Sequence, residues 1–194
     1  MTIKSKNQLS EALERLRTKL EASEAKRKQM EANNQTLSLI SNAVNTTDNL
    51  DDLFKKIHEA LQQVIDVPNF IIAIYDLQKE LISFPYIADR SNKTLPDVKP
   101  VTSSESPVFQ VIASGQTKIY DKNSPRNEQQ KIKAHINTSV KQWIGIPLKT
   151  RHVVIGAIVI QNYTDSKLYA RDDINLFNSI SNVIANAIDF KRDR

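Results

Sequence analysis

The 194-residue sequence contains no cysteine. Disulfide bonds, thiolate catalysis and cysteine-ligated zinc sites are therefore excluded, and the composition fits a cytoplasmic protein. Glycine is scarce, and the residues at 115, 145 and 156 cannot form a phosphate-binding loop or a dinucleotide-binding motif. No apolar run is long enough to span a bilayer, and none near Met1 resembles a secretion signal. We therefore expect no membrane insertion.

Titratable residues offer little catalytic chemistry. The formal net charge is +5, but basic and acidic residues alternate along the chain, so we expect solvated faces and no nucleic-acid binding. His58, His135 and His152 are far apart in sequence, which predicts no metal site and no cofactor. His58 is expected to be a capped or surface histidine. The paired carboxylates at 51–52 and 172–173 begin predicted helices, where the helix dipole favours them, so we expect no enzyme.

Residues 8–44 are expected to form one long helix with a heptad seam. Leucine spacings of four and three residues are typical of a coiled coil, and polar residues at inner positions would fix its register and a low oligomer number. A dimer is therefore expected, and the alternative is a frayed, partly disordered leader. The seam contains Leu9, Leu13, Leu16, Leu20, Ser23, Arg27, Met30, Asn34 and Leu37.

The remaining chain alternates helical and strand-like segments. Apolar residues at helical spacing predict a second helix over 50–65, which Pro68 ends. Ser106, Pro107 and Gly115 are the expected cap, first residue and end of a short helix. A helical turn is expected around 128–135 and a final helix from 172. The predicted strands are 69–76, 80–86, 98–102, 116–121, 141–149 and 153–161.

The final helix has two apolar stripes. Ile174, Phe177, Ile180, Ile184 and Ile188 form one, which we expect to cover the sheet. A second stripe consists of Leu176, Val183 and Phe190, and we expect it to meet a partner helix. Both ends of the chain are therefore expected to join one dimer interface.

Several motifs, in order, resemble a bacterial subgroup of GAF domains found before histidine kinase, diguanylate cyclase or PAS segments. The resemblance covers about residues 37–192. Its motifs are Ile57-His58-Glu59, Asn69 to Asp76, Phe84-Pro85-Tyr86 with Asp89, Trp143 to Leu148, and Gln161-Asn162-Tyr163 followed by Tyr169 and Asp172-Asp173. The turn before Ser106 reads Ser103-Ser104-Glu105 where the subgroup has a Gly-Leu-Thr-like sequence. The signature of cyclic-nucleotide-binding members is largely replaced, which neither implies nor excludes that ligand.

This resemblance implies an α+β fold: a central antiparallel sheet of about six strands with helices on both faces, preceded by a coiled-coil helix. The expected domains are a coiled coil over 1–36 and a GAF sensory domain over 37–192. The implied function is a homodimeric sensor that binds a small molecule, with a cyclic nucleotide such as cAMP leading. A C-terminal effector, such as a diguanylate cyclase or histidine kinase, would receive the signal in a longer protein. The alternative is a dimerisation module with a filled pocket and no ligand.

The predicted ligand site lies between the sheet and the layer formed by residues 87–138. An apolar cavity with a few placed polar groups is what a small-molecule site requires, and the N-terminus of the helix at Ser106 could hold a phosphate or carboxylate. The alternative for each aromatic residue is that it only fills the core, most of all for Trp143. The candidate residues are Phe84, Tyr86, Ser104, Ser106, Phe109, Tyr120, Asp121 and Trp143.

Overall fold

A computed structural model describes residues 2–89, 106–126, 129, 140–164 and 168–192. Its helices are α1 (Thr2–Thr46), α2 (Leu50–Gln62), α3 (Pro107–Ser114) and α5 (Arg171–Arg192). Its strands are β1 (Phe70–Asp76), β2 (Leu81–Ala88), β3 (Lys118–Tyr120), β4 (Gln142–Lys149) and β5 (Val154–Asn162). The strand predicted at 98–102, and all but one residue of the helical turn predicted at 128–135, lie outside the described residues.

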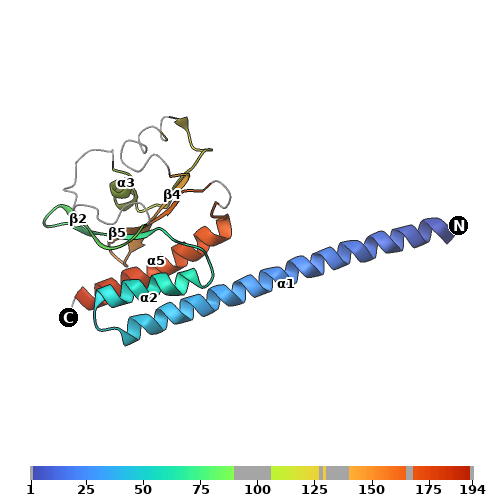
Figure 1. Ribbon diagram of the computed structural model, residues 1–194, viewed down its shortest axis with the longest axis horizontal. Coiled ribbons are helices and arrows are strands. Elements are labelled where there is room, and N and C mark those ends of the chain that lie inside the picture. Colours follow the sequence, from blue (N-terminus) through green and yellow to red (C-terminus); the bar gives the residue numbers. More distant parts are fainter. Residues whose placement is uncertain (1, 90–105, 127–128, 130–139, 165–167, 193–194) are drawn as a thin grey trace.

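The described strands form one antiparallel sheet in the order β2-β1-β5-β4-β3. Five strands are described where about six were expected. Strands β1, β4 and β5 are buried on nearly every residue because helices cover both faces (Figure 1). The α+β fold with a two-sided sheet is therefore confirmed.

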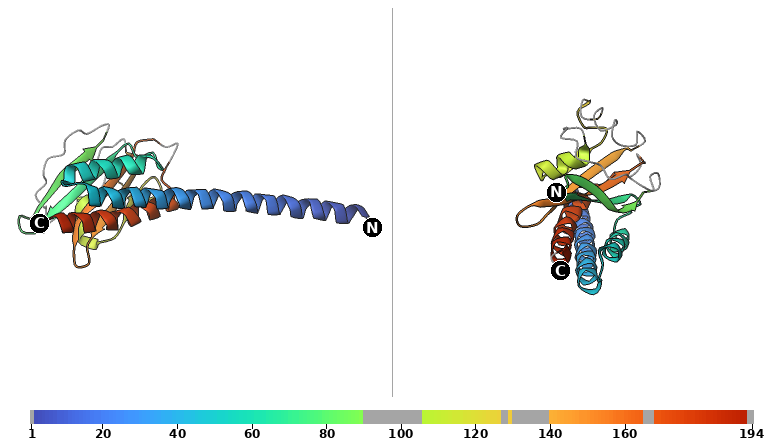
Figure 2. Two further views of the ribbon diagram at one scale, coloured as in Figure 1. Left: turned by 90° about the horizontal axis from the view of Figure 1, so that it is seen from below. Right: turned by 90° about the vertical axis from the view of Figure 1, so that its left-hand side faces the viewer.

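Three helices form a layer on one face of the sheet, which we call the helix face. Helices α2 and α5 contact the sheet, and α1 packs against both of them. The two views in Figure 2 show α1 and α5 side by side. Ile40 and Ala43 of α1 share a core cluster with Phe54 of α2 and Ile184 of α5. The end of α1 is therefore part of the GAF-like body.

Most of α1 extends away from this body (Figure 1). Its side chains from residue 7 to residue 31 are all exposed. A 45-residue helix is about 68 Å long at 1.5 Å per residue. The long helix predicted over 8–44 is confirmed, and its leucine seam is uncovered in one chain: Leu9, Leu13, Leu16 and Leu20 are 60–64% exposed.

The helix boundaries follow the local sequence. The Asn49 side chain accepts a hydrogen bond from the Asp52 N–H at 2.8 Å and caps α2. At α3, Ser106 caps, Pro107 is the first residue, and Gly115 ends the helix with φ of 59°, as predicted. The Ala170 N–H donates to the Asp173 carboxylate at 2.8 Å before α5. Asn49 and Asp173 therefore have structural roles at the starts of these helices.

The second stripe of α5 differs from its predicted role. Leu176 is buried and Val183 is half-buried, and both pack in the cluster that includes Ile40 and Ala43 of α1. Only Phe190 is well exposed, at 58%. Two of the three residues of the stripe predicted to meet a partner helix therefore pack within the chain's own core, on a helix that contacts α1.

Strand β2 contains an irregularity that decides which face its aromatic residues occupy. Ile72 pairs with Tyr86 and Ile74 pairs with Ser83, so Ala73 faces two residues, Phe84 and Pro85. Such a bulge interrupts the alternation of side chains along a strand. Phe84 therefore packs on the α3 side of the sheet, whereas Tyr86 packs on the helix face.

Candidate functional site

The face of the sheet beneath α3, which we call the α3 face, gathers four of the predicted site residues. Trp143 of β4 and Tyr120 of β3 are buried there, with their ring centroids 5.6 Å apart. Phe84 of β2 and Phe109 of α3 pack against the same cluster and remain half-buried. The structure brings these four aromatic residues together on one face, and their role in ligand binding stays a prediction.

Trp143 is the most constrained of these residues. It has no solvent exposure, and its indole ring lies over Gly145, where an added Cβ would lie 2.7 Å from Trp143 Cζ3, still nearer to Cη2, and 2.7 Å from Val111 Cγ2. Among the residues that the structure describes, its Nε1–H is the buried side-chain group without a hydrogen-bond partner. A buried N–H without an acceptor costs about 1–3 kcal/mol. The α3 face therefore contains one polar group that a bound acceptor would satisfy.

A groove of about 690 Å³ opens beside α3, at the edge of the sheet where the β1–β2 and β4–β5 turns lie. Tyr75 and Phe109 make an edge-to-face contact in its wall, with ring centroids 6.2 Å apart. The wall is mainly apolar, and its volume suits a small molecule. The sequence alone did not indicate this groove, although both hairpin turns lie at the same end of the strands. Its lining residues are Tyr75, Asp76, Leu77, Gln78, Phe109, Ile112, Ala113, Val153, Val154 and Ile155.

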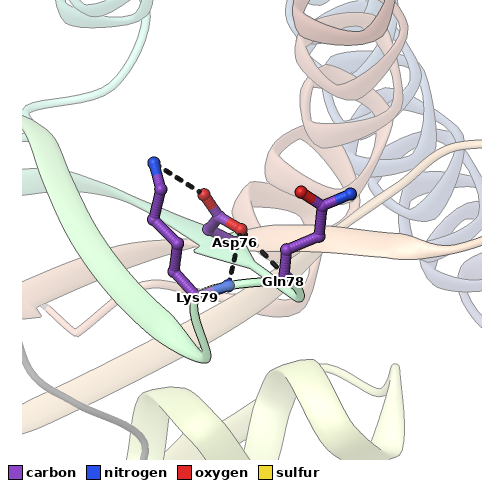
Figure 3. A network of polar contacts seen from close by, with 3 residues as sticks. All are labelled: Asp76, Gln78 and Lys79. Carbon is purple, nitrogen blue, oxygen red and sulfur yellow. Dashed lines mark hydrogen bonds and ion pairs between the residues drawn. The ribbon is translucent and has the colours of Figure 1, made fainter.

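Asp76 at the rim of this groove is occupied by its own turn (Figure 3). Its carboxylate accepts the backbone N–H groups of Gln78 and Lys79, both at 3.0 Å, and lies 3.3 Å from the Lys79 ammonium. The Lys79 backbone hydrogen bond is the main cause that lowers the pKa of Asp76. We therefore assign Asp76 to the β1–β2 turn.

The three polar candidates, which are Ser104, Ser106 and Asp121, are not shown to form a polar site on the α3 face. Ser106 uses its hydroxyl to accept the Phe109 N–H at 3.4 Å, and Ser104 lies outside the described residues. Asp121 accepts the backbone N–H of Asn123 at 2.8 Å in the turn after β3. Ser106 and Asp121 thus have local structural partners, and neither contacts Trp143 through a described hydrogen bond.

Tyr86 requires a correction, because the β2 bulge turns it away from the α3 face. Its hydroxyl lies 2.9 Å from Nδ1 of His58, and its ring contacts Phe70 and Phe54 edge-on. It therefore faces α2 rather than the layer of residues 87–138. The simple alternation of a strand predicted the same face for Phe84 and Tyr86, and the bulge at Pro85 separates them.

His58 is buried, contrary to the expectation of a capped or surface residue. Its ring stacks on Phe70 at 5.1 Å, and Nε2 lies 2.6 Å from the Val67 carbonyl. If Nε2–H donates to Val67, Nδ1 accepts from the Tyr86 hydroxyl, and the neutral ring satisfies both partners. Burial lowers the pKa of His58 and outweighs the Val67 hydrogen bond, which acts in the opposite direction. This arrangement connects α2, the start of β1 and β2.

The described part of the chain was also searched for a metal site and a membrane span. No group of three histidine, aspartate or glutamate side chains there could hold a metal ion. Within the same residues, no helix is apolar over enough of its length to cross a bilayer.

Comparison with protein families and solved structures now places the fold. The GAF domain family matches residues 47–189, and comparison with curated proteins gives no match. The chain therefore belongs to the GAF domain family, with a long helix before the domain.

Solved structures, including GAF domains, share the fold at low sequence identity. The GAF domain of an Acinetobacter phosphoenolpyruvate-protein phosphotransferase has a TM-score of 0.64 and 14% identity, covering 82% of this chain and 93% of that one. The GAF domain of a Bacillus halodurans two-component sensor histidine kinase has a TM-score of 0.59 and 14% identity, covering 74% and 95%. The free methionine-R-sulfoxide reductase of Neisseria meningitidis, solved with its substrate, has a TM-score of 0.59 and 13% identity, covering 83% and 90%. The fold is thus one used in bacterial signalling proteins.

Proposed function

We propose that this chain is the ligand-sensing regulatory module of a bacterial signal-transduction protein, and that it binds a small molecule on its α3 face. The observation that carries the proposal is the buried indole N–H of Trp143, which has no described partner. An acceptor on a bound molecule would remove the cost of that unpaired donor. On the same face, the half-buried rings of Tyr75, Phe84 and Phe109 pack against the cluster that contains Trp143 and supply apolar surface for a ligand.

A cyclic nucleotide such as cAMP is the leading ligand in this proposal. Aromatic rings provide flat surfaces on which a base can stack, and the α3 face has four of them in addition to Trp143: Tyr75, Phe84, Phe109 and Tyr120. The N-terminus of α3 would favour the phosphate. Because the chain departs from the signature of cyclic-nucleotide-binding members, the identity of the ligand requires a separate measurement from ligand binding itself.

The signal would leave through the helices. Helix α5 packs directly on β4, the strand that carries Trp143, and α1 packs on α5. In the proposed arrangement two chains pair through their terminal helices, and the exposed leucines of α1 supply the apolar surface. A C-terminal effector such as a diguanylate cyclase or histidine kinase would respond to the movement. The similar fold of the Bacillus halodurans kinase GAF domain supports this kind of output.

Trp143 makes the proposal directly testable, because it is the single tryptophan of the chain. Titration with cAMP or cGMP is expected to shift its fluorescence emission and to raise the melting temperature by mass action. Phe109→Ala should weaken the response, whereas Phe190→Ala, on the exposed side of α5, should leave it unchanged. Failure of both nucleotides would remove that ligand class. Failure of a broad metabolite panel, with no co-purified small molecule, would overturn ligand sensing.

The alternative is a dimerisation module whose pocket is filled by side chains. It is favoured by the close packing of Trp143, Val111 and Ile71, which are fully or almost fully buried. This alternative predicts a dimer whose emission and melting temperature respond to no ligand. Both versions propose a cytoplasmic protein without catalytic turnover, and a turnover assay that gave product would contradict that part.

A further inference from the structure

The groove of about 690 Å³ beside α3 exposes apolar side chains at its mouth. Leu77 in the β1–β2 turn is 74% exposed and Val153 in the β4–β5 turn is 54% exposed, and both line the groove. Apart from Asp76 and Gln78, its described lining residues are aliphatic or aromatic. Exposed apolar surface that is gathered in one place marks an interaction site, and a concave apolar surface of this size suits a small molecule.

Helix α3 runs along this groove from one strand to another. Near the start of the helix, the Phe109 ring contacts Tyr75 at the end of β1. At the end of the helix, a Cβ added at Gly115 would lie 3.3 Å from Val154 Cγ2 of β5. The groove therefore has a β1 end, which is walled by aromatic rings, and a β5 end, which lies close to the last turn of α3.

A lysine ammonium lies at the β5 end. The Lys149 side chain extends over Gly115, because the same added Cβ would be 3.1 Å from Lys149 Cε and 3.5 Å from its Nζ. Lys149 is exposed, and within the described residues its ammonium has no ion pair or hydrogen bond. Arg151 in the β4–β5 turn adds a second positive charge to the same end. The β5 end therefore favours an anion.

The acidic residues beside the groove belong to its other end. Asp76 is held by its own turn and paired with Lys79, and Glu80 follows in that turn. The groove therefore has an apolar middle with its positive charge at one end, which fits a molecule with an apolar body and one anionic head. An extended peptide fits less well, because its backbone N–H and C=O groups would lie unpaired against apolar walls.

We propose that this groove binds an amphipathic carboxylate, with its apolar body along the groove wall and its carboxylate at the Lys149 ammonium. Medium-chain fatty acids and aromatic carboxylic acids belong to this chemical class. Trp143 and Lys149 lie near opposite ends of β4 (Gln142–Lys149), which places them about 20 Å apart along an extended strand. The inference therefore concerns a second site, goes beyond the proposed function and does not depend on it.

Isothermal titration calorimetry of the full chain with decanoate and with 2-naphthoate tests the binding of this class. Decylamine is the matched control, because it has the same chain length as decanoate and the opposite charge. At least one of the two carboxylates should bind, and decylamine should bind at least about threefold more weakly than decanoate, since the charges at the β5 end repel it. Absence of binding by both carboxylates, or equal affinity for decanoate and decylamine, would overturn the proposal.

Variants of Lys149 test the contact with the carboxylate. Lys149→Gln should raise the dissociation constant of decanoate about threefold, the size expected for an exposed ion pair, without weakening the binding of decylamine. Lys149→Glu should reverse the preference, so that decylamine binds more tightly than decanoate. Lys56→Gln, at an exposed position of α2, is the matched control and should leave both affinities unchanged.

A variant of Ala113 tests the groove itself. Ala113 is an exposed residue of α3 that lines the groove, so Ala113→Glu places a carboxylate on the apolar wall and should raise the dissociation constant of decanoate at least about tenfold. Gln62→Glu adds the same charge at an exposed position of α2 and should have no effect. Decanoate binding that is equally strong in Ala113→Glu and Lys149→Gln would lie elsewhere on the chain and would overturn the proposal.

The Trp143 titration on the same preparations separates this inference from the proposed function. A chain that binds decanoate in the groove, but whose Trp143 emission and melting temperature respond to no ligand of the α3 face, keeps the groove site and loses the sensing role. A chain whose Trp143 responds to a nucleotide, but which binds neither carboxylate, loses only the groove site.

Discussion

Replacing Gly145 by alanine is a direct test of how the α3 face is packed. A Cβ at this position would lie 2.7 Å from Trp143 Cζ3, nearer still to Cη2, and 2.7 Å from Val111 Cγ2. Ordinary contacts of this kind are about 3.5–4.0 Å, so the indole must move by about 1 Å. Trp143 has no exposed surface into which it can move, and overpacking of this kind costs about 1–3 kcal/mol.

Urea unfolding of Gly145→Ala should therefore show a free energy of unfolding about 1–3 kcal/mol below that of the wild-type protein. The emission of Trp143 should shift in the same variant, because its ring is the group displaced. Gly156→Ala is the control: its Cβ would press on the backbone of Ala73, with the carbonyl carbon at 3.1 Å. That variant should also be destabilised, but without a comparable emission change in the folded state. A Gly145→Ala protein with unchanged stability and unchanged emission would refute the placement of the indole over Gly145.

Three further predictions concern the helix face. Asn49→Ala removes the cap of α2 and should lower the free energy of unfolding by about 1 kcal/mol. Asn45→Ala, at an exposed position of α1, is the control and should be near neutral. Equal urea midpoints for the two variants would contradict the capping role. Tyr86→Phe leaves His58 Nδ1 without its partner and should lower the free energy of unfolding by about 1 kcal/mol. Tyr75→Phe is the control and should lower it by less. Equal decreases in urea unfolding would argue against the hydrogen bond between Tyr86 and His58. Because burial lowers the pKa of His58 from its ordinary 6.5, the unfolded chain binds more protons in acid. The contribution of His58 to stability is therefore complete above about pH 6.5 and decreases as the pH falls toward the lowered pKa. Urea titrations across this range should show that slope in the wild-type protein and a smaller slope in His58→Gln; identical slopes would show that His58 does not titrate as described.

The sequence predicted the elements whose causes are local. The cap, first residue and end of α3 are written within residues 106–115, and the structure has each of them where predicted. The same holds for the carboxylates in the first turns of α2 and α5. Burial of the sheet on both faces followed from strands that are apolar on nearly every residue. These signals depend only on neighbours in the chain, so one sequence is enough to interpret them.

Features that depend on distant partners were missed. His58 can be buried because its ring nitrogens bond to the Val67 carbonyl and the Tyr86 hydroxyl, and nothing near Ile57 in sequence indicates those partners. The position of Tyr86 depends on how β2 pairs with β1, since one bulge reverses the faces that alternation predicts. The second stripe of α5 was assigned to a partner because the return of α1 onto the body cannot be read from a heptad pattern.

Strands β4 and β2 suggest different routes by which a signal could cross the sheet. Strand β4 is hydrogen-bonded on both sides, to β3 and β5, so a displacement of Trp143 along this route must distort two ladders. Strand β2 stands at the end of the described sheet and pairs only with β1 there. Its bulge places Phe84 on the α3 face and Tyr86 against His58 of α2. In the proposed mechanism a ligand must bind one of two conformations of the domain more tightly than the other. Moving an edge strand breaks fewer hydrogen bonds than moving an inner strand. In the proposed mechanism, the β2 bulge would therefore carry a signal from the α3 face to the helix face at lower cost than β4, the strand that packs on α5.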